Sequence, residues 1–330
     1  MRTWVSVACL GVASVACTPV CGPESGDQSC RLRGPDGWRP IEIVAPQDLS
    51  EPLPLVLNLH GGGGSGSDQA IESEMSPFAR EQGFLLVYPT SGRAEDGKRR
   101  WNSGERQTEG RQGTEDDVAY LLDLIDQIGE LYPVDPGRIY MTGLSNGAQM
   151  TYRFACEAGD RIAAAAAVAG TQVSEPPCTP PVAVPMLILH GTADSFIPFN
   201  GGPSIPELGA AGSVEDQIAI PAVTEFWAQN NGCTQAPMVS FEQGEVRCEA
   251  HRGCTQGAEV QLCTIEGGGH NWPGSEAYPI GRTRFGRVLT SLVADHWPGH
   301  VTQDIDANEA VWSFFQRIER TGPDGTSPSR

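Results

Sequence analysis

A serine between two glycines is the residue with the clearest chemical potential in this chain. Ser145 is the centre of Gly-Leu-Ser-Asn-Gly at 143–147, which directly follows an apolar run and directly precedes a helical pattern. A G-x-S-x-G sequence between a strand and a helix is typical of a nucleophile held in strained backbone geometry, with its hydroxyl exposed above a sheet. The pattern predicts that Ser145 is a catalytic nucleophile; the alternative is a structural Gly/Ser turn.

A serine hydroxyl is a weak nucleophile and needs a base, and six histidines are available. His270 follows three glycines beyond the last predicted strand, where a flexible loop can bring an imidazole to the edge of a sheet. His60 and His190 each end an apolar run and precede a glycine, a position typical of histidines that bind loop backbone beneath a site. We therefore predict His270 as the base, with His190 as the alternative.

The base requires a carboxylate that fixes its tautomer and stabilises the imidazolium. Asp194 lies just beyond the apolar run at 186–189 and shortly before Pro198, so we predict that it is this acid. The alternative is an Asx turn before the proline. The chain order serine, aspartate, histidine is that of the α/β-hydrolases and differs from the orders of two unrelated serine protease families.

Acyl transfer also needs hydrogen-bond donors for the oxyanion that develops on the carbonyl. His-Gly-Gly-Gly-Gly-Ser at 60–65 follows the first core strand, and glycines let backbone N–H groups approach such an oxygen closely. We predict the N–H groups of Gly62 and Asn146 as the donors. A phosphate-binding loop is the rival interpretation, but the segment lacks Gly-Lys-Ser/Thr and no helical pattern follows it at once.

Alternating strands and helices must position these residues. Apolar runs predict buried strands at 54–59, 84–88, 138–142, 162–169, 186–189 and 259–265. Apolar periodicity predicts helices at 116–131, 146–158, 222–231 and 307–318. Strands that are apolar along their whole length are buried on both faces. Alternation of such strands with helices predicts an α/β domain with a mostly parallel central sheet and helices on both faces. The order serine, aspartate, histidine given above makes the predicted class an α/β-hydrolase fold, as a single domain over 31–320.

The N-terminus carries an export pattern. A basic start precedes an apolar stretch at 4–16 that ends in Ser-Val-Ala, a small-x-small cleavage motif before Cys17. We predict a signal peptide over 1–16 and a tether over 17–30, with a flexible tail over 321–330 at the other end. The predicted location is secreted and extracellular. The alternative is a membrane-anchored lipoprotein with a lipid anchor at Cys17, although lipoproteins usually carry leucine where Ser14 stands.

Charge and hydropathy exclude several partners. The 22 basic and 41 acidic residues give a formal net charge of −19, which repels phosphate backbones and anionic lipid, so we predict no nucleic-acid partner. No run of about 18 apolar residues occurs, so we predict no transmembrane span.

Ten cysteines accompany the export pattern. Without Cys9 in the predicted signal peptide and without Cys17, an even number remains, which outside the cytoplasm indicates disulfides. On the order of 100 pairings are possible, so the connectivity stays open. The set that we prefer is Cys21–Cys30, Cys156–Cys178, Cys233–Cys254 and Cys248–Cys263. Metal ligation competes with this interpretation, but no CxxC pair or HxxxH spacing supports it, so we predict no metal and no cofactor.

Several segments, in this order, resemble a branch of secreted esterases. They are HGGGGSG at 60–66, YPTSG at 88–92, WNSG at 101–104, DDVAYLLDLI at 116–125, GLSNGAQM at 143–150, LHGTADSFIPF at 189–199 and GGGHNWPG at 267–274. The branch comprises the polyhydroxybutyrate depolymerase-like and feruloyl-esterase-like members of the α/β-hydrolases, and the match covers about residues 34–318.

The resemblance implies a serine esterase in which Ser145, Asp194 and His270 form the triad. It implies that Trp101 and Trp272 are candidate walls of the substrate cleft, unless each is simply a packed aromatic. It further implies that Asp117 braces loops near the site, and it is consistent with the late pair Cys233–Cys254.

The implied substrates are carboxylic esters: feruloyl or acetyl esters of plant polysaccharide, or polyester (hydroxyalkanoate) oligomers. A polyhydroxybutyrate depolymerase acting on polymer is an alternative that the sequence favours less, because no separate substrate-binding domain is visible. A non-catalytic binding protein and a peptidase on the same fold stay open as further alternatives.

Overall fold

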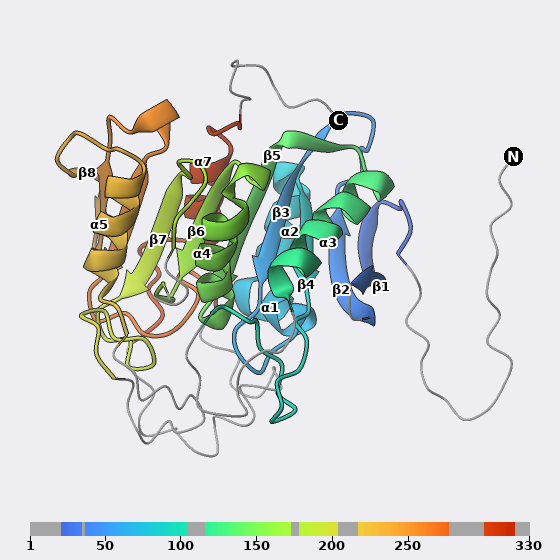
Figure 1. Cartoon of the computed structure of the whole chain (residues 1–330), viewed down its shortest axis with the longest axis horizontal. Coiled ribbons are helices and arrows are strands. Elements are labelled where there is room, and N and C mark those ends of the chain that lie inside the picture. Colours follow the sequence, from blue (N-terminus) through green and yellow to red (C-terminus); the bar gives the residue numbers. More distant parts are fainter. Residues whose placement is uncertain are drawn as a thin grey trace, which may run out of the picture.

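One mixed sheet crosses the part of the molecule that the computed structural model describes, residues 21–34, 37–104, 116–172, 178–203, 217–276 and 300–320 (Figure 1). Its strand order is β1-β2-β4-β3-β5-β6-β7-β10-β9-β8. The strands are β1 (Gly26–Gly34), β2 (Gly37–Ala45), β3 (Leu53–Leu59), β4 (Leu85–Pro89), β5 (Val134–Leu144), β6 (Ala164–Val168), β7 (Met186–Gly191), β8 (Met238–Gln243), β9 (Val246–His251) and β10 (Val260–Ile265). The predicted signal peptide, Cys17 and the predicted tail lie outside the described residues.

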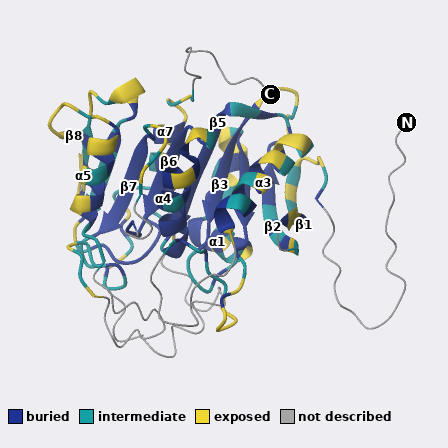
Figure 2. Ribbon diagram, in the orientation of Figure 1, coloured by how far each residue is buried: buried dark blue, intermediate teal, exposed yellow. Residues whose placement is uncertain are grey.

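The centre of the sheet is parallel and its two ends are antiparallel. Strands β4, β3, β5, β6, β7 and β10 pair in parallel, whereas β1 and β2 at one end and β9 and β8 at the other pair antiparallel. Every residue of β3, β4, β6 and β7 is buried, as Figure 2 shows for the central strands. The predicted mostly parallel sheet is confirmed, because strands apolar along their whole length need cover on both faces.

Helices supply that cover. They are α1 (Gly66–Ser73), α2 (Met75–Gln82), α3 (Asp117–Leu131), α4 (Asn146–Ala158), α5 (Ile220–Asn230) and α7 (Ala307–Phe315), with short 3₁₀ turns η1 (Gly159–Arg161) and η3 (Thr255–Gly257). Helices α3, α4 and α5 pack with one hydrophobic cluster, and α2 and α7 pack with the other, on opposite faces of the sheet (Figure 1). The four predicted helices all form, and α3 begins after Asp116, whose carboxylate caps the N–H of Ala119.

Four outer strands and two helices were not predicted, and one prediction is corrected. Residues 26–30, assigned to the tether, belong to β1, which pairs along its length with β2. The side chain of Cys30 is buried, and so is that of Cys21 just before the strand. Only Cys30 and Leu32 in β1 are apolar, and the remaining residues are polar or glycine. The composition of this strand therefore resembles that of a connector.

The eight described cysteines form the four pairs of our preferred set: Cys21–Cys30, Cys156–Cys178, Cys233–Cys254 and Cys248–Cys263. The last pair joins directly opposed residues of β9 and β10. Cys233–Cys254 joins the end of α5 to the segment that leads into β10. Two covalent links therefore fix β10, the strand that precedes His270. Within the described residues, no helix has the length and apolar character that crossing a bilayer requires.

We expect the free energy of unfolding of the Cys233→Ala/Cys254→Ala variant to be about 3 kcal/mol lower than that of wild type. The pair is separated by 21 residues, and opening a loop of that size restores chain entropy to the unfolded state. Thermal unfolding should show a midpoint lower by roughly 4 to 5 °C. An unchanged midpoint, with the disulfide verified in wild type by peptide mapping, would contradict this expectation.

Candidate active site

Ser145 occupies a sharp turn between β5 and α4. Its backbone has φ 57° and ψ −118°, a conformation that side chains with a Cβ adopt at an energetic cost. Its N–H donates to the carbonyl oxygen of Val168 at 3.0 Å, which ties the turn to the end of β6. A Cβ at Gly147 would collide with the carbonyl oxygen of Leu59, so the glycine of the motif is required by close packing. The strained turn of the predicted nucleophile is therefore present.

Asp194 and His270 meet directly, although they are far apart in the chain. Asp194 follows β7, His270 follows β10, and these strands are parallel neighbours. His270 Nδ1 lies 2.7 Å from Asp194 Oδ2. Because an ionised carboxylate only accepts, Nδ1 carries the proton and Nε2 keeps its lone pair. This is the tautomer that a general base needs.

The second carboxylate oxygen of Asp194 holds its own loop. Oδ1 accepts the N–H groups of Phe196 and Ile197, each at 2.9 Å. The turn before the proline and the contact with His270 are thus made by the same side chain, so the two interpretations of Asp194 are compatible. Burial alone raises the pKa of this carboxyl, but the adjacent His270 and His190 and the Ile197 N–H outweigh burial. The pKa of Asp194 lies below its ordinary value, so the group is ionised at neutral pH.

His190 serves a different purpose from His270. Its Nε2 lies 2.8 Å from the carbonyl oxygen of Ile197, an acceptor, so this nitrogen carries the proton. The same nitrogen is 3.4 Å from Asp194 Oδ2, and its side chain is fully buried. Burial lowers the pKa of His190 despite the nearby carboxylate. A neutral, enclosed imidazole of this kind supports the acid loop, and the geometry favours His270 as the base.

Ser145 lies at the same edge of the sheet as the Asp194–His270 pair. The three residues follow β5, β7 and β10, whose carboxyl ends share one edge in the order β5-β6-β7-β10. Among the described residues no hydrogen bond joins the Ser145 hydroxyl to His270. Catalytic hydrogen bonds are often long in a free site and tighten when substrate binds.

The glycine loop after β3 lies over the serine turn. A Cβ built on Gly61 would meet the Cβ of Ser145 at 3.5 Å, and one built on Gly62 would meet that of Asn146 at 3.7 Å. The two predicted oxyanion donors are therefore neighbours. Within the described part of the chain, the N–H groups of Gly62 and Asn146 have no acceptor, so both can donate to a ligand.

The His60 side chain holds the glycine loop at 61–64 through hydrogen bonds of both ring nitrogens. Its Nε2 accepts the N–H of Ser91 at 3.0 Å, and its Nδ1 lies 2.7 Å from the carbonyl oxygen of Gly61. These partners fix the neutral tautomer with the proton on Nδ1. Burial lowers the pKa of His60 to about 4, and the cation of Arg99 acts in the same direction. A neutral His60 thus holds the loop throughout the neutral range.

The two tryptophans predicted as cleft walls are interior residues. Trp101 and Trp272 are 0% and 1% exposed, so neither can face substrate. The indole N–H of Trp101 donates to the carbonyl oxygen of His60, and that of Trp272 donates to Asn308. Of the alternatives for these residues, the packed aromatic is correct. Position next to a motif indicates nearness to the site, but it does not indicate on which side of the loop an indole lies.

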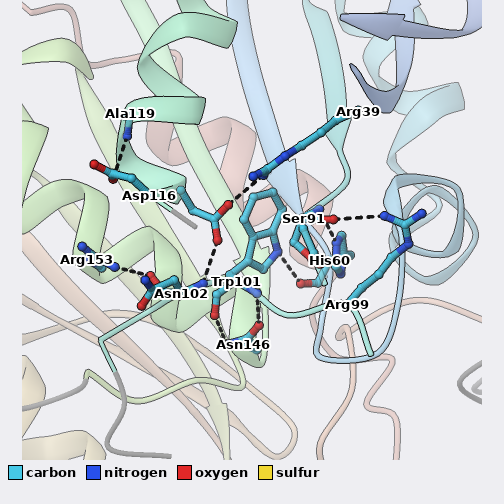
Figure 3. A network of polar contacts seen from close by, with 12 residues as sticks. Arg39, His60, Ser91, Arg99, Trp101, Asn102, Asp116, Ala119, Asn146 and Arg153 are labelled. Carbon is cyan, nitrogen blue, oxygen red and sulfur yellow. Dashed lines mark hydrogen bonds and ion pairs between the residues drawn. The ribbon is translucent and has the colours of Figure 1, made fainter. Parts of the chain in front are cut away.

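Asp117 braces the loop that contains Trp101 through two partners, Arg39 and Asn102, which Figure 3 labels. It forms a buried ion pair with Arg39 at 2.7 Å and accepts the N–H of Asn102 at 2.7 Å. Arg39 was not singled out from the sequence, because a lone arginine in β2 belongs to no motif. No group of three or more His, Cys, Asp or Glu residues suited to a metal ion occurs in the described segments.

Comparison with known proteins finds one matching family and several relatives whose names describe esterases. Residues 42–179 match the family described as esterase PHB depolymerase. Feruloyl esterase B of Piromyces equi is 32% identical over 228 residues, which cover 66% of this chain and 39% of that protein. A putative esterase, NocK, of Nocardia uniformis subsp. tsuyamanensis is 31% identical over 239 residues, which cover 68% of this chain and 67% of that protein.

A more distant sequence relative and one solved structure are also similar to this chain. A poly(3-hydroxybutyrate) depolymerase of Ralstonia pickettii is 24% identical over 279 residues, covering 79% of this chain and 52% of that protein. The solved acetyl xylan esterase of Aspergillus awamori superposes with a TM-score of 0.51 at 16% identity, over 71% of this chain and 89% of that one. The chain thus spans well under half of the feruloyl esterase B that it matches and about half of the depolymerase.

We expect acid to destabilise the protein partly through His60. Its pKa is about 4 when folded and roughly 6.5 when unfolded, so between these values the unfolded state binds the extra proton. Stability is fully present above pH 6.5 and is lost as the pH falls toward 4. Between pH 7 and 4.5 this loss amounts to about 2 to 3 kcal/mol.

His60→Gln should remove this contribution. Urea unfolding at pH 7 and 4.5 should show a smaller pH-dependent drop in unfolding free energy for the variant than for wild type. Equal drops in the two proteins would rule out the buried neutral state of His60.

Proposed function

Because the chain belongs to the esterase PHB depolymerase family, we propose that it hydrolyses carboxylic esters through Ser145, His270 and Asp194. The observation that carries this proposal is the 2.7 Å hydrogen bond from His270 Nδ1 to Asp194 at the sheet edge that also holds the strained Ser145 turn. The feruloyl esterase B that is similar in sequence and the acetyl xylan esterase that is similar in fold support the same chemistry.

The proposed reaction has two halves that use the same groups. His270 Nε2 takes the proton of the Ser145 hydroxyl as its oxygen attacks the ester carbonyl. The tetrahedral intermediate collapses, and His270 returns the proton to the leaving alkoxide. Water then attacks the acyl-enzyme and gives a proton to His270. The second tetrahedral intermediate collapses, His270 returns this proton to the departing Ser145 oxygen, and the carboxylic acid is released. Asp194 stays ionised throughout and stabilises the imidazolium.

The N–H groups of Gly62 and Asn146 are the proposed oxyanion donors. Both lack an acceptor among the described residues and flank Ser145 from two different elements. Donors that are fixed before the reaction need no reorganisation when charge develops on the carbonyl oxygen, and each contributes about 3 kcal/mol to the barrier reduction.

We assign the substrates to feruloyl or acetyl esters of plant polysaccharide. Support comes from the named relatives, a feruloyl esterase at 32% identity and an acetylxylan esterase/xylanase at 26%. Polyester oligomers are the second candidate, favoured by the 24% identical depolymerase. Initial rates on methyl ferulate, acetylated xylan and hydroxybutyrate oligomers decide between the two classes. We further propose that the protein is secreted. The four disulfides among the described residues suit an oxidising compartment, which supports this location.

Replacing the nucleophile should abolish turnover without unfolding the protein. We expect Ser145→Ala to lower kcat on p-nitrophenyl acetate by at least about 10⁴-fold and to prevent labelling by a fluorophosphonate, since no other group supplies the attacking oxygen. Ser240→Ala, on the exposed strand β8, is the matched control and should keep wild-type activity and labelling. Wild-type activity in Ser145→Ala would remove the serine from the mechanism.

Asp194→Asn should trap the wrong tautomer of His270. The N–H groups of Phe196 and Ile197 hold an oxygen at the Oδ1 position, so the amide NH₂ must face His270 Nδ1. Nδ1 then accepts, and the proton moves to Nε2, where a base is needed. We expect kcat to fall by roughly 10³- to 10⁴-fold with little change in KM. Asp48→Asn, which keeps its turn bond to Ser50 in the β2–β3 connection, is the control, and a comparable loss there would refute this explanation.

A further inference from the structure

We propose that Trp101 is a positioning residue that links the two oxyanion donors to each other. This inference rests on the proposed ester hydrolysis and adds a residue that touches neither substrate nor the triad. Trp101 is fully buried, and its backbone and its indole reach opposite halves of the donor pair.

The first link joins Trp101 to Asn146. The N–H of Trp101 donates to Asn146 Oδ1 at 2.8 Å, and Asn146 Nδ2 donates back to the carbonyl oxygen of Trp101 at 3.2 Å. The Asn146 amide thus pairs with both backbone polar groups of Trp101, accepting from its N–H and donating to its carbonyl oxygen (Figure 3). Nδ2 also lies 3.3 Å from Ser103 Oγ and from Gln149 Oε1, so its orientation is over-determined. The backbone of Asn146, which carries the proposed donor, is held by its own side chain.

The second link joins Trp101 to the glycine loop. The indole N–H donates to the carbonyl oxygen of His60 at 3.0 Å, one residue before the glycines begin. The imidazole of His60 packs against the indole with ring centroids 5.1 Å apart. Gly61 and Gly62 have no side chains with which to anchor the loop, so its height above Ser145 depends on contacts such as this one.

A buried ion pair between Asp117 and Arg39 anchors the loop that contains Trp101 and Asn102. The N–H of Asn102 donates to one oxygen of Asp117, and the other oxygen binds Arg39 at 2.7 Å. The guanidinium of Arg39 also lies 4.0 Å from the ring centroid of Tyr120, which in turn stacks with Trp101. Buried charges that are paired in this way keep their geometry, because separating them leaves a charge without compensation.

The functional consequence follows from the tolerance of an oxyanion site. Donors act when they lie about 2.7 to 3.1 Å from the developing oxyanion, and a displacement of about 1 Å costs on the order of 100-fold in rate. A residue bonded to both sides of the donor pair sets their separation. Its loss should therefore weaken binding of the transition state far more than binding of the ester itself.

The test compares Trp101→Phe with Trp227→Phe. Trp227 is equally buried and packs against Tyr152, but its indole nitrogen has no hydrogen-bond partner among the described residues. Both variants lose ring volume, and only Trp101→Phe loses a bond to the oxyanion loop. With p-nitrophenyl acetate, we expect Trp101→Phe to lower kcat about 10-fold or more with KM within about twofold, and Trp227→Phe to keep the wild-type kcat.

Phenylboronic acid supplies a readout that a merely structural role does not move. Its tetrahedral adduct with the serine places an oxygen against the oxyanion donors, so its Ki for Trp101→Phe should rise by the factor by which kcat/KM falls. Asn146→Ala keeps the backbone donor but removes the pairing with Trp101, and it should show the same signature. The double variant should lose less than the product of the two single losses.

Wild-type kcat in Trp101→Phe, or a loss of kcat without a matching rise in the boronate Ki, would overturn the inference. If Trp101→Phe does not fold, Asn146→Ala carries the same test. Failure of the proposed esterase function is seen separately, as the absence of ester turnover and of fluorophosphonate labelling in wild type.

Discussion

The hydrogen bond between Asp194 and His270 is the interaction on which the site depends. It joins loops that lie 76 residues apart, and it is possible only because β7 and β10 are parallel neighbours whose carboxyl ends share an edge. The two disulfides around β10 hold the strand that precedes His270, and the hydrogen bonds to Asp194 Oδ1 hold the turn that carries the carboxylate. Much of the second half of the described fold can therefore be understood as support for the orientation of one imidazole.

Three histidines at this edge differ in role because their partners differ. His60 accepts a backbone N–H, His190 donates to a carbonyl oxygen, and His270 donates to a carboxylate. The first two are enclosed, and burial lowers the pKa of each. Residue type alone would make each of them a candidate base, whereas the chemistry of the hydrogen-bond partners separates the two supporting histidines from the proposed base.

The catalytic candidates were predictable because they sit in short motifs with a fixed local context. Ser145 requires a strand, a strained turn and a helix, and each of these leaves a clear local pattern in the sequence. The central strands were equally accessible, since burial on both faces leaves no polar alternation. Strand β1 was not predicted because it is largely polar, and β8 was not predicted because it has no buried face that would produce an alternating pattern. Arg39 and the true location of Trp101 depend on long-range packing, which no local pattern encodes.

The sheet ends at β8, whose six residues are all exposed, among them Met238, Val239 and Phe241. A terminal strand of this kind presents backbone groups to which a foreign strand can add, and apolar side chains favour such addition. Arg247 on β9 forms ion pairs with Glu242 on β8 and with Glu249 on β9. Charged side chains on such a strand oppose the addition of a foreign strand, so these ion-paired groups counteract the exposed apolar side chains at this edge of the sheet.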